Sequence, residues 1–152
     1  MRVAVGFDHR GVTLRHAVLA RLVALGHEAV DFGVHDDAVR VDYPDVAASV
    51  GRAIQQGRAE RGILVCGSGV GACVAANKLR GIRAGICHDS YSAHQGVEHD
   101  DMNVLCLGSE IVGAAVVDEL VAAFLSARFD GGERYVSRLK LVEKLEESGN
   151  GR

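Results

Sequence analysis

A cysteine stands directly before a run of alternating glycines in the segment VCGSGVGACVAANK, residues 65–78. Cys66 ends an apolar stretch that is typical of a buried strand, and Gly67, Gly69 and Gly71 follow it. Backbone N–H groups in a glycine turn bind anions, and a helix that begins there would favour the reactive thiolate form of the cysteine. The segment predicts either a reactive thiol beside an anion site or a tightly packed turn with a structural cysteine.

The loop fits one nucleotide-binding motif but lacks required residues of three other motifs. Gly67, Gly69 and Ala72 fit the dinucleotide pattern G-x-G-x-x-A, and Asp89 lies where the pattern places its acidic residue. Against that interpretation, the loop follows the third predicted strand and a thiol stands at its mouth. This loop lacks the Lys-Ser/Thr pair that a Walker A motif requires after its glycines. It also has Ala72 where a C-x5-R phosphatase loop needs arginine, and Leu64 where a nucleophile elbow needs glycine.

Other residues suited to acid–base chemistry or anion binding lie outside the loop. Asp8 and His9 occupy the first predicted strand-to-helix turn, where an aspartate also serves as a helix cap. His99 can transfer protons near neutral pH. Arg134 and Arg138 are four residues apart, so both guanidinium groups share one helix face and can bind a phosphate, unless they form a solvated face balanced by nearby glutamates.

Strands and helices alternate along the chain. Short apolar runs, several of them without polar alternation, predict strands over residues 2–7, 28–33, 62–67, 82–87 and 103–108. Amphipathic patterns predict helices over 11–25, 44–57, 70–80, 111–127 and 133–147. This order predicts a Rossmann-like three-layer α/β/α fold with a five-stranded parallel sheet and an extended C-terminal helix.

Such sheets bind ligands beyond the carboxyl ends of their strands. Asp8 and His9 follow the first predicted strand, Cys66 ends the third, and Ser109 and Glu110 follow the fifth. We therefore expect the site at this edge of the sheet.

Length and composition limit the class of protein. The chain has 152 residues, which suits a single domain over residues 1–147 with a disordered polar tail over 148–152. A net charge of −3 argues against a nucleic-acid or membrane surface. The four cysteines form no C-x-x-C pair, which argues against a metal site, and no export signal precedes the first strand, so we expect reduced thiols and a cytoplasmic location.

Several motifs together resemble one family along nearly the whole chain. The sequence resembles type B ribose-5-phosphate isomerases and galactose-6-phosphate isomerases in DHRG, DYPD, GILVCGSGVGACVAANKLRGIRA, HDDMNVL and GGERYVSR, which begin at residues 8, 42, 62, 99 and 131. The resemblance implies a cofactor-independent aldose–ketose isomerase of sugar phosphates in carbohydrate metabolism, such as the pentose phosphate pathway. It also implies a homodimer or a dimer of dimers, with each site built from two subunits.

The resemblance assigns catalytic roles to a few of these residues. Cys66 matches the base that moves a proton between C1 and C2, Ser68 matches a hydroxyl residue that assists it, and His99 matches the residue that protonates the ring oxygen. The backbone amides expected to stabilise the enediolate are those of Gly67, Gly69, Val70 and Gly71.

The resemblance also assigns substrate ligands, and two positions depart from its pattern. Asp8 and His9 match ligands of hydroxyls and phosphate, and Arg134 and Arg138 match phosphate ligands. Asp100 stands where the family usually has asparagine, and Glu110 where it usually has a phosphate-binding arginine. A carboxylate repels phosphate, so we expect Glu110 to change which sugar is bound, with Arg10 as a replacement cation.

Two alternatives to the isomerase remain at this point. One is a sugar-phosphate or nucleotide-binding module that has lost catalysis through Glu110 and Asp100, and the other is an NAD-dependent oxidoreductase. The binding module predicts no isomerase turnover on any sugar phosphate. The oxidoreductase predicts that NAD binds, which a titration with NAD measures.

Overall fold

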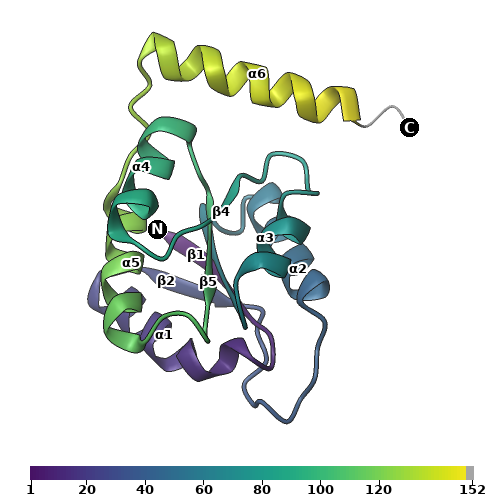
Figure 1. The fold of residues 1–152 in the computed structure, drawn as a ribbon, viewed down its shortest axis with the longest axis vertical. Helices are drawn as coiled ribbons and strands as arrows, with labels where there is room; N and C mark the ends of the chain where they lie inside the picture. Colours follow the sequence, from purple (N-terminus) through teal and green to yellow (C-terminus); the bar gives the residue numbers. More distant parts are fainter. Residues whose placement is uncertain (150–152) are drawn as a thin grey trace.

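The computed structural model describes residues 1–149, which form one parallel sheet covered by helices on both faces (Figure 1). The strand order is β2-β1-β3-β5-β4, and every pair is parallel. The strands are β1 (Arg2–Phe7), β2 (Glu28–Asp31), β3 (Arg61–Cys66), β4 (Ala84–Ile86) and β5 (Val104–Gly108). The predicted three-layer fold with a five-stranded parallel sheet is confirmed.

Helices pack on the two faces of the sheet because its central strands are apolar on both sides. β3 is buried from Gly62 to Cys66 without polar alternation, as a strand covered on both faces should be. One face carries α1 (Arg15–Ala24), α4 (Ser90–Asp100) and α5 (Ala114–Ser126), and the other carries α2 (Tyr43–Gln55) and α3 (Val70–Ala76). A short 3-10 turn, η1 (Gly11–Leu14), precedes α1.

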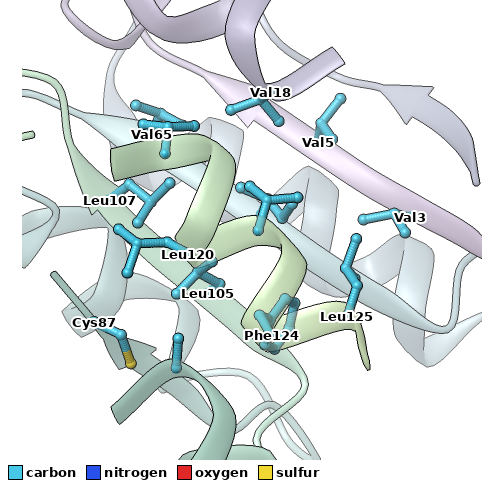
Figure 2. Packing of buried hydrophobic residues seen from close by; sticks show 14 of the residues in the cluster. Val3, Val5, Val18, Val65, Cys87, Leu105, Leu107, Leu120, Phe124 and Leu125 are labelled. Atoms are coloured by element: carbon cyan, nitrogen blue, oxygen red, sulfur yellow. The ribbon is translucent and has the colours of Figure 1, made fainter. Parts of the chain in front are cut away.

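The core consists of two apolar clusters, one on each side of the sheet. Leu120 and Phe124 of α5 lie over the strand residues Val65, Leu105 and Leu107 in the larger cluster (Figure 2). The smaller cluster joins α2 and α3 to the opposite face. Burying this much apolar surface holds the central strands β1, β3 and β5 in register, so their carboxyl ends form a rigid edge.

The helix α4 was not expected from the sequence. Only Ala93 and Val97 of its eleven residues are buried, so its apolar stripe is one residue wide and gives a weak periodic signal. Its start does have a local signal, because the Asp89 carboxylate accepts a hydrogen bond from the Ser92 N–H at 2.7 Å. The fourth strand is shorter than predicted and covers only Ala84–Ile86.

The C-terminal helix α6 (Glu133–Gly149) extends away from the sheet and has no buried residue (Figure 1). It begins where predicted and runs through Ser148 and Gly149, two residues beyond the expected end. The rest of the expected disordered tail, residues 150–152, lies outside the described residues. Within residues 1–149, no helix is long and apolar enough to span a membrane.

Candidate active site

Cys66 ends β3 at the carboxyl edge and is buried, with 5% of its surface exposed. Its neighbour across the sheet is Gly108, the last residue of β5. The Gly69 N–H donates a hydrogen bond to the Cys66 sulfur at 3.1 Å. Gly69 has a φ of +83°, a left-handed conformation that glycine adopts readily, and this turn is what aims its amide at the thiol. The loop therefore folds back over the sulfur.

Backbone hydrogen bonds join the Cys66 loop to the ends of the neighbouring strands. The Ser109 N–H donates to the Cys66 carbonyl at 2.8 Å, and the Glu110 N–H donates to the Gly67 carbonyl at 3.0 Å. The Asp8 N–H donates to the Val65 carbonyl at 3.2 Å. Three strand ends are thereby held as one unit at the carboxyl edge, where the site was expected.

Ser68, Val70 and Gly71 complete the loop. Ser68 is exposed, and its hydroxyl accepts a hydrogen bond from the Val70 N–H at 3.3 Å. The Tyr43 ring packs over Gly71 so closely that a Cβ there would lie 2.8 Å from the ring. Tyr43 belongs to the DYPD motif, and no role was predicted for it. Its ring fits against the loop because Gly71 has no side chain.

Asp8 and His9 are positioned by the turn after β1. The buried Asp8 carboxylate accepts hydrogen bonds from the N–H groups of Arg10 at 2.9 Å and Gly11 at 2.8 Å, which is the capping arrangement considered from the sequence. The His9 Nδ1 donates to the Val41 carbonyl at 3.2 Å. This bond leaves Nε2 as the nitrogen available to a ligand.

His88 is a second positioning residue without a predicted role. Its Nε2 accepts a hydrogen bond from the Gly108 N–H at 3.0 Å, which fastens the last residue of β5 to the chain after β4. His88 follows the strand predicted over residues 82–87, but nothing in the local sequence indicates that its partner is a backbone amide 20 residues away.

Glu110 does not stand alone at this edge, because Arg10 pairs with it. The Arg10 Nε donates to Glu110 Oε1 at 3.0 Å, and Nη2 contacts the same oxygen. The bond and charge of Glu110 raise the pKa of Arg10, with smaller contributions from Asp8 and Cys66. The negative charge introduced at position 110 is thus balanced by a guanidinium from another strand end.

His99 and the two arginines lie at the opposite edge of the sheet. α4 returns antiparallel to the strands, so His99 near its end lies beside the start of β5. The four residue steps from Val104 to Gly108 alone span about 13 Å. Arg134 is joined to His99 through the Tyr135 hydroxyl, and Asp100 and Arg138 line a cavity beside the turn before β4, so the folded chain does not bring these four residues to Cys66.

His99 is held in a fixed orientation by α4 and α6. The Gln95 amide donates to its Nδ1 at 2.8 Å, and its Nε2 faces the Tyr135 hydroxyl at 3.2 Å. The two rings stack with centroids 4.4 Å apart. Arg134 donates to the same Tyr135 hydroxyl at 2.6 Å, so Tyr135, another residue without a predicted role, joins the histidine to the arginine.

A cavity of about 750 Å³ lies between α6 and the turn before β4. Asp100 and Arg138 line it together with apolar residues of α6, including Val142 and Leu145. The Gly81 N–H donates to Glu146 at 2.8 Å across one end of the cavity. Within residues 1–149, no three His, Cys, Asp or Glu side chains gather as metal ligands would.

The fold and the loop define a parallel α/β protein with a thiol and backbone amides at the edge where such sheets bind ligands. The Ribose/Galactose Isomerase family model matches residues 3–142, and the chain belongs to that family. The family expected from the sequence motifs is therefore confirmed.

Relatives with solved structures or assigned activities match almost end to end. Ribose-5-phosphate isomerase B of Escherichia coli is 41% identical over 98% of this chain and 99% of its own length. D-erythrulose-4-phosphate isomerase of Pectobacterium atrosepticum is 36% identical over 87% of each chain. The structure of ribose-5-phosphate isomerase B from Clostridium thermocellum superimposes with a TM-score of 0.93 at 39% identity, covering 97% of this chain and 99% of the other.

Proposed function

We propose that the chain interconverts the aldose and ketose forms of a sugar phosphate, with Cys66 as the base. The observation that carries this proposal is the Cys66 sulfur at a buried strand end, beneath a loop whose Gly69 amide points at it. Family membership supports the reaction, because isomerases of both ribose 5-phosphate and erythrulose 4-phosphate are among the relatives.

The proposed reaction begins with ring opening and ends with a proton moved by one carbon. For ring opening, His99 donates its Nε2 proton to the ring oxygen as the bond from that oxygen to C1 breaks, and the C1 hydroxyl releases its proton to water, which leaves the C1 aldehyde. The Cys66 thiolate then removes the proton from C2 of the open aldose, and the electron pair forms the C1–C2 double bond while the C1 carbonyl oxygen becomes an oxyanion. The thiol returns the proton to C1, and Ser68 carries the hydroxyl proton from O2 to O1. Amides of Gly67, Gly69, Val70 and Gly71 stabilise the enediolate.

We infer that the complete site includes a second copy of the chain. Because His99 lies near the end of α4, at the edge opposite Cys66, the His99 that opens the ring is proposed to come from another subunit. The helix α6 supports this arrangement, because it buries no residue in its own chain and exposes Leu141 and Leu145. A homodimer, or a dimer of dimers, would cover α6 and join the two edges.

The alternative of a binding module without catalysis rested on Glu110 and Asp100. The Arg10–Glu110 ion pair weakens that argument, since a cation remains beside the loop despite the carboxylate at position 110. The dinucleotide alternative loses its support with membership in an isomerase family.

Isomerisation in D₂O tests the proposal directly. Wild type incubated with ribose 5-phosphate or erythrulose 4-phosphate should incorporate solvent deuterium at C1 or C2, detected by NMR. Cys66→Ala should lose turnover by about 10²- to 10⁴-fold, the range for loss of a general base. Cys87→Ala, which removes another buried thiol, is the matched control and should keep its rate. A Cys66→Ala variant with the wild-type rate would refute the role of Cys66.

A further inference from the structure

The Arg10 side chain lies directly against the glycine loop. A Cβ built on Gly67 would be 2.5 Å from Arg10 Cζ and 2.8 Å from Nη1, so the guanidinium occupies the space that any other residue at position 67 would fill. The Arg10 backbone is anchored on both sides, because its N–H donates to Asp8 and its carbonyl accepts from the Ser109 hydroxyl at 2.8 Å. This cation is therefore placed by the same strand ends that place Cys66.

Glu110 uses only part of the guanidinium. The contacts to Glu110 Oε1 come from Nε and Nη2, whereas Nη1, which lies beside Gly67 together with Nε, does not contact Glu110. Both side chains are more than half exposed, at 54% for Arg10 and 60% for Glu110. An ion pair this exposed contributes little to stability, which points to a role toward a ligand.

We propose that Arg10 is a specificity-determining residue that contacts the phosphate of the substrate, while Glu110 holds its guanidinium against Gly67. This inference rests on the proposed function for the identity of the substrate. Within residues 1–149, Arg10 Nη1 donates no hydrogen bond, and a planar guanidinium with such a free edge binds phosphate oxygens well, so a ligand seated on the loop amides lies within its reach. Glu110 limits the affinity, because its carboxylate repels the phosphate that Arg10 attracts.

The pair also restricts how the sugar lies in the site. Gly67 directly follows Cys66, so a phosphate on Arg10 is held close to the carbon atoms that Cys66 deprotonates. The number of sugar carbon atoms between the phosphate and C2 must therefore match this fixed spacing. Changing Arg10 should therefore alter the relative kcat/KM of four-, five- and six-carbon sugar phosphates, as well as the affinity for phosphate itself.

The test measures inorganic phosphate binding by calorimetry and sugar-phosphate kinetics on the full chain. Arg10→Gln should weaken phosphate binding by about tenfold or more, and raise KM by more than it lowers kcat. Arg10→Lys should fall between Arg10→Gln and wild type, since it keeps the charge without the fork. Glu110→Gln should tighten phosphate binding a few-fold. Arg21→Gln is the matched control, because it breaks the distant Arg21–Asp118 ion pair between α1 and α5.

The inference is overturned if Arg10→Gln and Arg21→Gln bind phosphate with affinities within about twofold of each other. It is also overturned if Arg10→Gln lowers kcat alone. A wild type that binds phosphate through Arg10 but turns over no sugar phosphate would refute the proposed function and leave the phosphate site in place.

Discussion

The two edges of the sheet differ in how their functional residues are held. At the carboxyl edge, backbone hydrogen bonds join the loop after β3 to the residues that follow β1 and β5, and Cys66 is buried beneath them. At the amino edge, His99 is held by side chains of α4 and α6, and α6 itself buries nothing. The first edge is thus held by the backbone of one chain, whereas the functional residues of the second edge are held by side chains alone.

Complementation between two inactive variants is the strongest test of this comparison. Cys66→Ala and His99→Asn should each be inactive, but a dissociated and reassociated equal mixture should recover about a quarter of wild-type activity, because half of the dimers hold one intact site. Turnover of the mixture measures the recovery. A mixture of Cys66→Ala and Cys66→Ser is the control and should recover nothing. Equal outcomes for both mixtures would mean that each site lies within one chain.

A charge on the exposed face of α6 should separate the subunits. Leu145 is 72% exposed in the single chain, so Leu145→Asp should leave the fold intact while it weakens association by at least about tenfold, the cost of burying an unpaired charge. Sedimentation at several concentrations measures the change. Val23→Asp on α1, at 76% exposure, is the matched control and should associate like wild type. Unchanged association of Leu145→Asp would remove α6 from the interface.

The rigidity of the carboxyl edge can be tested at Gly108. A Cβ there would lie 2.7 Å from the Ser68 backbone, so Gly108→Ala must displace the loop and should cost about 2 to 4 kcal/mol of unfolding free energy. Chemical denaturation and phosphate binding measure both effects. A Cβ on Gly113, which has ordinary φ, meets nothing within 4 Å, so Gly113→Ala should change stability little. Similar losses in the two variants would contradict a tightly packed loop.

Cys73 on α3 can be compared with Cys87, because their environments shift the pKa values of the two thiols in opposite directions. Its hydrogen bond with Cys106 is the main cause that lowers its pKa to about 7, whereas burial raises the pKa of Cys87 to about 11. Alkylation of Cys73 should therefore increase about tenfold per pH unit up to pH 7 and then level off. Mass spectrometry of the labelled peptides follows each thiol. A plateau only above pH 9 would contradict this environment.

The contributions of Cys73 and Cys87 to folding stability should depend on pH in opposite directions. A pKa lowered by folding makes Cys73 stabilising above its unfolded pKa, and that contribution is lost as the pH falls toward 7. A pKa raised by folding makes Cys87 stabilising below its unfolded pKa, and that contribution is lost as the pH rises toward 11. Denaturation midpoints of Cys73→Ala and Cys87→Ala across this range measure each contribution.

Features with a strong local pattern were predictable from the sequence. The strand that ends at Cys66 is a continuous apolar run, and the glycines after it require a turn, so strand, loop and α3 follow one another without ambiguity. α4 was missed because its buried stripe consists of Ala93 and Val97 alone. Because α4 was not predicted, the return of the chain along α4 to the edge opposite Cys66, where His99 lies, was missed as well.

The sequence by itself determined the family, the parallel α/β fold and the edge where Cys66 lies, because each depends on residues that are neighbours in the chain. Only the tertiary structure decided that Arg10 pairs with Glu110, 100 residues away, and that His99 lies at the other edge. Pairing across strand ends and the return path of a helix depend on strand order and packing. These relations arise only when the sheet is assembled.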